Sequence, residues 1–297
     1  MTNIRKNSFR AWVLAARPKT LPAAATPVLV ACAAAVHEHH FRWQPALICF
    51  LFAVIAQIIS NFANDYFDYR KGSDNAERLG PQRAVAEGWI APKTMLHATV
   101  GLLIADCMIG LLLIPYGGWQ LLGIGAFIAL AALGYSGGPY PLAYHGLGDV
   151  AVLIFFGIVP VGFTYYVQAL QWSVPVVVCG VACGLVTINI LVSNNFRDRF
   201  SDKRAGKNTS IVMFGEKFGI YFYLMNGLLA VACCQYFWTE KAFGAAVLPL
   251  VYLVFHIKTW REMVAIGQGE QLNVILGKSA RNVLIFGCLL AIGLLAS

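Results

Sequence analysis

Two acidic segments stand where a long apolar run meets a basic loop, and their residue types and spacing could do chemistry. They share one asparagine–aspartate pattern, with Asn61, Asp65 and Asp68 in the first and Asn194, Asp198 and Asp202 in the second. Residues three and four apart share a face of a helix, so each segment predicts a row of oxygen ligands at a helix end. Carboxylates are costly beside hydrocarbon, and two such rows indicate a functional site.

The chemistry that these rows favour is metal-assisted binding of a phosphate group. Aspartates gathered in a low-dielectric pocket repel one another unless cations neutralise them. Carboxylate and amide oxygens suit Mg²⁺, which readily shares its coordination shell with substrate phosphates. Two Mg²⁺ ions would balance four aspartates, and a diphosphate would add about three negative charges. Basic residues in the same loops can supply the balance: Lys71, Arg83, Arg197, Arg199, Lys203, Arg204 and Lys207.

The elements that must position these residues are membrane helices. Hydrophobic residues make up 59% of the 297 positions and charged residues only 12%, with a mean hydropathy of +0.66. Soluble domains carry about twice that charged fraction. The composition predicts an all-α, polytopic membrane protein with one domain over residues 1–297. Nine apolar runs are long enough to span a bilayer: 20–36, 45–66, 94–114, 118–135, 148–169, 174–195, 219–238, 243–260 and 279–296.

The basic residues predict the orientation of these helices. The N-terminal tail and the three long gaps, together with the helix ends that flank them, hold 20 of the 22 Lys and Arg residues; only Arg42 and Lys241 lie elsewhere. Positive loops face the cytoplasm, so the N-terminus and both acidic rows are predicted on the cytoplasmic side of the cell inner membrane.

Several other features carry simpler interpretations. The eight cysteines lie in apolar runs without a CxxC pair, so they predict no disulfide framework. The run His37-Glu-His39-His40 is interpreted as a solvated loop. A basic tail ahead of Cys32 resembles a signal sequence, but Pro22 and Pro27 within the first apolar run favour a retained helix. Asp106 is an intramembrane carboxylate to which no role is assigned.

The sequence resembles the UbiA superfamily of intramembrane aromatic prenyltransferases, and within it the branch that acts on 1,4-dihydroxy-2-naphthoate. The resemblance covers nearly the whole chain. The motifs that carry it are Arg17-Pro-Lys-Thr-Leu-Pro22, Asn64-Asp-Tyr-Phe-Asp68, Lys71-Gly-Ser-Asp74, Gly80-Pro-Gln-Arg83, Gly146-Leu-Gly-Asp149, Asn195-Phe-Arg-Asp198 and Gly206-Lys-Asn-Thr209. Asp74 follows Asp68 by six residues, which departs from the general pattern.

The resemblance implies nine transmembrane helices around a central cavity that opens to membrane lipid. It assigns Mg²⁺, with two ions expected, to Asp65, Asp68, Asp198 and Asp202, with Asn61, Asn64 and Asn195 completing or orienting the coordination. The diphosphate of a polyprenyl donor would then lie against the basic residues Lys71, Arg83, Arg197, Lys203 and Lys207.

The implied reaction transfers the polyprenyl group to 1,4-dihydroxy-2-naphthoate with loss of CO₂, which gives demethylmenaquinone in menaquinone biosynthesis. Arg17 and Lys19 would bind the acceptor carboxylate or only set topology. Asp149 would contact an acceptor hydroxyl or only cap a helix, and the ring of Tyr135 would shield the carbocation beside the acceptor.

Two alternatives remain open. Another aromatic acceptor, such as 4-hydroxybenzoate or homogentisate, would use the same metal site. A cation-coupled transporter also places aspartates on facing helices. CDP-alcohol phosphotransfer is disfavoured because its Asp-Gly-x-x-Ala-Arg signature is absent from the sequence. No nucleic-acid partner is predicted.

Overall fold

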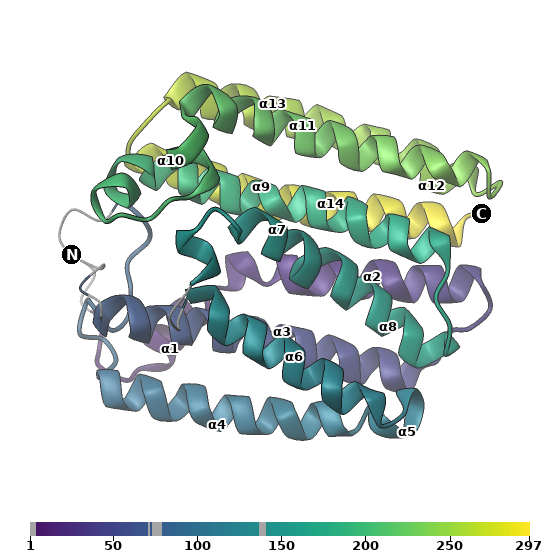
Figure 1. The fold of residues 1–297 in the computed structure, drawn as a ribbon, viewed down its shortest axis with the longest axis horizontal. Helices are drawn as coiled ribbons and strands as arrows, with labels where there is room; N and C mark the ends of the chain where they lie inside the picture. Colours follow the sequence, from purple (N-terminus) through teal and green to yellow (C-terminus); the bar gives the residue numbers. More distant parts are fainter. Residues whose placement is uncertain (1–3, 71, 73–78, 137–140) are drawn as a thin grey trace.

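A computed structural model describes residues 4–70, 72, 79–136 and 141–297, and over these ranges the chain is helical with no β-sheet. Long helices lie side by side, and the connections gather at the two ends of the bundle (Figure 1). The principal helices are α1 (Phe9–Ala16), α2 (Pro22–His37), α3 (Trp43–Arg70), α4 (Pro92–Leu111), α5 (Ile114–Gly117), α6 (Gln120–Ser136), α7 (Gly148–Leu153), α8 (Val159–Ala169), α9 (Val174–Arg204), α10 (Ser210–Phe214), α11 (Glu216–Cys234), α12 (Phe243–Val247), α13 (Tyr252–Ile266) and α14 (Asn273–Leu295).

Short helical turns connect some of these helices. A π-helical turn, η3 (Ile154–Ile158), joins α7 to α8. The 3₁₀ turns are η1 (Pro18–Thr20), η2 (Leu142–Tyr144), η4 (Gln235–Trp238), η5 (Leu248–Val251) and η6 (Glu270–Leu272).

The prediction of an all-α, multi-pass membrane protein is confirmed. Among the described residues, seven helical segments are long and apolar enough to cross a membrane. The pair Phe9–Thr20 and Pro22–His37, bent by 52°, makes an eighth if it is one span, and α6 is a shorter apolar helix. Helix α1 and the C-terminal end of α14 lie at opposite ends of the bundle (Figure 1). The count of nine, the central cavity and the cytoplasmic N-terminus stay predictions.

The two helices that carry the acidic rows are longer than a bilayer requires. Helix α3 has 28 residues and α9 has 31, whereas about 20 residues span the hydrocarbon core. The sequence places the ends of the apolar runs at 66 and 195, and both helices continue beyond those points. Their last turns therefore extend past the apolar layer and present the aspartates on regular helix rather than on loops.

Glycines bring α9 close to the segment that follows Asp149. A Cβ built on Gly157 would lie 2.4 Å from the carbonyl oxygen of Gly180 and 2.6 Å from the Cα of Gly184. Gly180 and Gly184 form a small-xxx-small pair, which lets helix backbones touch within membranes. This contact packs η3, which directly follows α7, against α9.

Apolar packing holds part of the loop after α3 against the helix bundle. Ala84, Val85, Trp89 and Ile90 are buried in one cluster with Phe62 of α3. Further members of that cluster come from the N-terminal segment and from α4. The loop is thus a fixed part of the bundle over its described residues, not a solvated connection.

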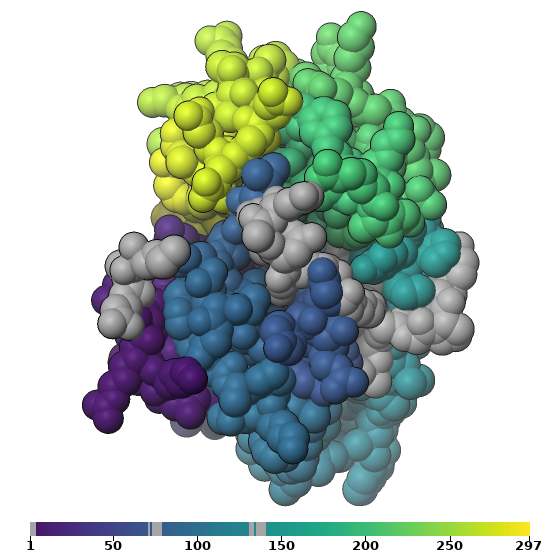
Figure 2. All heavy atoms as spheres, turned by 90° about the vertical axis from the view of Figure 1, so that its left-hand side faces the viewer, coloured from purple at the N-terminus to yellow at the C-terminus, as the bar shows by residue number. Residues whose placement is uncertain are grey.

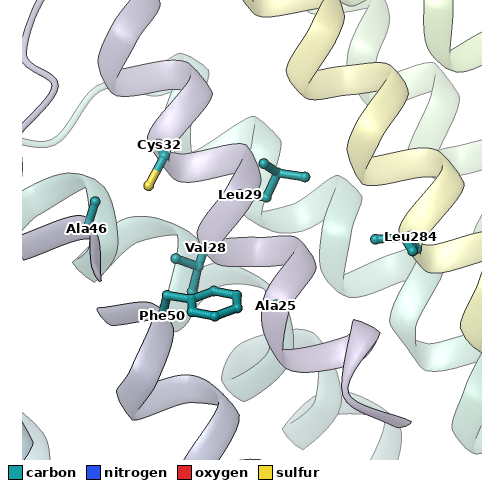
Figure 3. Close-up of a pocket in the computed structure, with 7 residues that line it drawn as sticks. All are labelled: Ala25, Val28, Leu29, Cys32, Ala46, Phe50 and Leu284. Atoms are coloured by element: carbon teal, nitrogen blue, oxygen red, sulfur yellow. The ribbon is translucent and has the colours of Figure 1, made fainter. Parts of the chain in front are cut away.

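An apolar cavity of about 270 Å³ lies between α2, α3 and α14. Figure 3 shows its lining side chains, which come from all three helices and carry no charge. They are Ala25, Val28, Leu29, Cys32, Ala46, Phe50 and Leu284. Such a lining accommodates hydrocarbon and gives a polar head group no partner.

Candidate active site

The loops that follow α3 and α9 gather on one face of the molecule, which Figure 2 presents to the viewer. Each acidic row lies at the end of its helix on this face, and each is paired with arginine. The loop of the first row spans residues 79–91 in the described part of the chain.

Asp65 anchors the loop after α3. Its side chain is 1% exposed, and its two carboxylate oxygens accept backbone N–H groups from Ala84 (3.0 Å) and Val85 (3.2 Å). Hydrogen bonds to a carboxylate are stronger than those between neutral groups. Asp65 therefore contributes to loop position as well as negative charge, a role that its spacing in the sequence does not reveal.

Asp68 lies one turn further along α3 and pairs with Arg83. The Arg83 Nη2 to Asp68 Oδ2 distance is 2.8 Å, with Asp68 29% and Arg83 8% exposed. Because Arg83 directly precedes the two residues whose amides Asp65 binds, the loop carries its cation to a fixed place. Arg83 was predicted from its motif, and the structure brings it to the first row.

Asn61 connects the first row to the N-terminal segment. Its Nδ2 donates to the carbonyl oxygen of Ala16 (2.9 Å) and to the hydroxyl of Thr20 (3.1 Å). Arg17 lies between these two residues in a left-handed conformation (φ 51°) and is half-buried, whereas Lys19 is exposed. These contacts bring Arg17 to the first row and favour an orienting role for Asn61 rather than a ligand role.

Arg197 organises the second row from a fully buried position, with 1% of its side chain exposed. Its guanidinium donates twice to Asp198, from Nε at 2.8 Å and from Nη2 at 2.5 Å. It also donates to Oδ1 of Asn194 at 2.5 Å and to Oδ1 of Asn273 at 2.8 Å. Two of the three side chains that Arg197 holds come from the predicted row.

Asp202 ends the second row beside Lys207, with 3.5 Å between Lys207 Nζ and Asp202 Oδ1. Within the described ranges, the other carboxylate oxygen of Asp202 is buried without a hydrogen-bond partner. A buried carboxylate oxygen without a partner is costly, so this atom is the one in the second row most suited to a bound cation.

Three further basic or amide residues of the second motif lie around this row. Arg199 points away from it: its guanidinium donates to Gly267 O (3.0 Å) and pairs with Glu216 (3.2 Å). Lys203 is exposed and Asn195 is buried. Arg199 therefore ties α9 to α11 and to the end of α13, and the prediction that it faces a diphosphate loses its support.

Asp149 is brought to the loop that leaves the second row. The amide of Asn208 donates to the carbonyl oxygen of Tyr144 at 3.0 Å, which ties residues 142–148 to residues 205–210. Asp149 is 8% exposed in the first turn of α7, and the hydroxyl of Ser210 lies close to its carboxyl group. Oδ1 of Asp149 has no hydrogen-bond partner in the described part of the chain.

The loop of the first row and the arginine of the second row are connected by Asn273, a residue that no sequence motif indicates. Asn273, the first residue of α14, accepts from Arg197 and donates from Nδ2 to the carbonyl oxygen of Leu79 at 2.8 Å. Leu79 begins the described part of the loop that Asp65 and Arg83 anchor. No motif surrounds Asn273, and only its partners in space identify it.

The donor set fits a hard cation, although the described residues alone do not form a closed metal cage. Among the described residues, no group of three or more Asp, Glu, His or Cys side chains converges on one point. Oxygen ligands stand on two separate helices, and one carboxylate oxygen of Asp202 lacks a partner in the described chain. This arrangement suits ions that a substrate diphosphate would also coordinate. Lys71 and Asp74, and the side chain of Tyr135, lie outside the described residues.

Comparison with known proteins identifies the family of this chain. The chain is 32% identical to a 1,4-dihydroxy-2-naphthoate octaprenyltransferase of Escherichia coli, over 100% of this chain and 99% of that protein. An enzyme of the same name from Mycobacterium tuberculosis is 39% identical, with 76% of each chain covered. A solved structure of digeranylgeranylglyceryl phosphate synthase has the same fold, with a TM-score of 0.61 at 18% identity over 97% of this chain and 99% of that one. The model of the UbiA prenyltransferase family matches residues 24–265, and the chain belongs to this family.

Proposed function

We propose that this membrane enzyme transfers a polyprenyl group from polyprenyl diphosphate to 1,4-dihydroxy-2-naphthoate, with Mg²⁺ bound between the two acidic rows. The observation that carries the proposal is the junction of the rows: residues 79–91, anchored by Asp65, and Arg197, which holds Asp198, meet at Asn273. The names of the relatives supply the acceptor. Lys71 and Tyr135 stay in the proposed site on sequence grounds alone.

The donor half of the site binds a leaving diphosphate. When bound, Mg²⁺ would supply charge neutralisation for the departing pyrophosphate; Asp65, Asp68, Asp198 and Asp202 would hold it. Asn61, Asn64 and Asn195 would complete or orient that set.

The basic side chains stabilise the charge that develops as the prenyl C1–O bond breaks and its electron pair moves to the diphosphate. Lys207, 25% exposed beside Asp202, and Arg83 are placed to contact its oxygens, and Lys203 at the surface adds positive potential.

The acceptor half would lie beside Asp149 and Arg17. The ring carbon of the naphthoate attacks C1 of the allylic cation and then loses its proton. The carboxylate leaves as CO₂, a proton takes its place, and the product is the hydroquinone of demethylmenaquinone. The partnerless Oδ1 of Asp149 in the described chain is suited to accept a hydrogen bond from a phenolic hydroxyl, and Arg17 and Lys19 to attract the carboxylate. The surrounding apolar helices exclude water from the cation.

The site would face the cytoplasm in a bacterial inner membrane. The basic N-terminal tail and the loops around both acidic rows lie on the same end of the bundle (Figures 1 and 2). Positive loops are retained on the cytoplasmic side, where a diphosphate substrate is made available in water. The prenyl chain would remain in the bilayer.

The test is an assay of the purified protein in lipid nanodiscs with one polyprenyl diphosphate and three acceptors: 1,4-dihydroxy-2-naphthoate, 4-hydroxybenzoate and homogentisate. We expect Mg²⁺-dependent release of pyrophosphate and CO₂ with the naphthoate alone. Turnover with 4-hydroxybenzoate or homogentisate instead would assign a different acceptor. Absence of pyrophosphate release with all three, together with cation flux across proteoliposomes, would refute the enzyme and favour a transporter.

A further inference from the structure

We propose that Asn273 is a positioning residue that couples the two acidic rows, an inference that rests on the proposed function for its role in metal and diphosphate binding. A single carboxamide holds the loop of the first row with one atom and the arginine of the second row with the other. The coupling makes the geometry of each row depend on the other.

Both polar atoms of Asn273 are engaged, and each engages a different half of the site. Its Nδ2 donates to the Leu79 carbonyl oxygen at 2.8 Å, and its Oδ1 accepts from Arg197 Nη1 at 2.8 Å. These partners lie 194 and 76 positions away along the chain. The carboxamide of asparagine carries both the donor and the acceptor that these two bonds use.

Asn273 affects the second row through its hydrogen bond with Arg197. This side chain is buried, and its remaining donors hold Asp198 and Asn194. A guanidinium is planar and its donors keep a fixed fork geometry. Removing the Asn273 oxygen would leave one buried donor unpaired and allow the plane to rotate, and Asp198 would rotate with it.

Asn273 affects the first row through its hydrogen bond with Leu79, at the start of the described part of the loop after α3. Leu79 lies four residues before Arg83, which pairs with Asp68, and five before Ala84, whose amide Asp65 binds. The Asn273 contact therefore fixes the start of the segment whose later residues meet both aspartates. Without it, the described part of the loop would keep its anchor at Asp65 and lose its connection to α9.

The first measurement is backbone amide exchange in metal-free, full-length protein, which requires no activity. We expect Asn273→Ala to exchange about tenfold faster at the hydrogen-bonded amides of residues 84–90, because opening of the loop no longer has to break the bond from Asn273 to Leu79. Asn273→Asp keeps the oxygen that Arg197 needs and lacks the donor for Leu79, so it should show the same increase. The matched control is Asn282→Ala, because Asn282 is a buried asparagine of α14 that bonds Thr259 at 3.0 Å.

The second measurement is the Mg²⁺ concentration for half-maximal turnover, with kcat and both KM values. Asn273→Ala should raise that concentration about tenfold or more and lower kcat, with the acceptor KM unchanged. Asn273→Asp should shift it less because Arg197 stays held. Unchanged exchange and an unchanged Mg²⁺ requirement would overturn the proposal, as would equal changes in Asn282→Ala.

The two measurements separate this inference from the proposed function. If wild-type protein shows no Mg²⁺-dependent turnover, the proposed function fails, whereas the exchange result still decides whether Asn273 fixes the loop. If wild-type protein turns over normally and the exchange in Asn273→Ala equals that of wild type, the positioning inference alone fails. Asn273→Asp serves both measurements if Asn273→Ala does not fold.

Discussion

Replacing Asp65 with asparagine tests the anchored loop directly. The Asp65 carboxylate accepts the amides of Ala84 at 3.0 Å and Val85 at 3.2 Å. Asparagine has one acceptor oxygen, and its NH₂ group would face a second N–H donor. The change removes one hydrogen bond to a charged acceptor, worth about 1.5–3 kcal/mol. Opening of the loop should therefore become about 10- to 150-fold more frequent.

Hydrogen exchange of peptides that cover residues 82–88 measures this opening at one fixed pH. Asp68→Asn is the matched control, because it breaks the ion pair with Arg83 and leaves both backbone anchors in place. That pair is worth about 1 kcal/mol at most, since water reaches Asp68, which is 29% exposed. Exchange in Asp65→Asn no faster than in Asp68→Asn would refute the reasoning that Asp65 holds the loop.

Four further expectations follow from the same geometry. Asp202→Asn should abolish turnover with little change in melting temperature, since one of its oxygens is partnerless in the described chain; a near-normal rate would exclude it as a ligand. Lys207→Ala, which removes the cation 3.5 Å from Asp202, should raise the donor KM about 3- to 30-fold and not the acceptor KM, so an unchanged donor KM argues against a phosphate contact. Gly157→Ala, whose Cβ would lie 2.4 Å from Gly180 O, should destabilise the protein by roughly 1–3 kcal/mol in thermal unfolding, and a wild-type melting temperature would contradict this close packing. EDTA should stop product formation and excess Mg²⁺ restore it, whereas full activity in EDTA would eliminate the metal.

The helices and the position of both acidic rows could be predicted from the sequence because they depend on local patterns. A run of about 20 apolar residues has one favourable structure in a bilayer. If this segment is a helix, the spacing of Asn61, Asp65 and Asp68 places all three on one face of it. The last turns of α3 and α9, beyond residues 66 and 195, could not be predicted from hydropathy. Buried arginines and contacts with the loops stabilise these turns, whereas lipid does not.

The distribution of roles within the site could not be predicted, because it depends on partners distant in sequence. Asp65 and Asp68 look equivalent in the motif, yet one binds two backbone amides and the other an arginine. Arg197 and Arg199 are two positions apart and face different partners, because successive positions on a helix point about 100° apart. Asn273 carries no local signal at all.

The pairing of aspartate with arginine offsets the cost of burying carboxylates in both rows. Buried carboxylates would otherwise be strongly disfavoured, and each row contains one bidentate or close arginine contact. Arg197 is held by Asp198, Asn194 and Asn273 and is 1% exposed, so turning it toward a ligand would break four hydrogen bonds.

Arg83 is also buried, with 8% of its side chain exposed, and its partner Asp68 is 29% exposed, against 21% for Asp198. A metal ion bound to Asp68 would replace Arg83 as its partner. The guanidinium of Arg83 could then pair with the diphosphate at the mouth of the site. We therefore assign Arg83 to the ligand and Arg197 to the scaffold, although both were predicted as diphosphate contacts. The same residue type would then serve binding in one row and positioning in the other, because Arg197 also holds Asn273 at the start of α14.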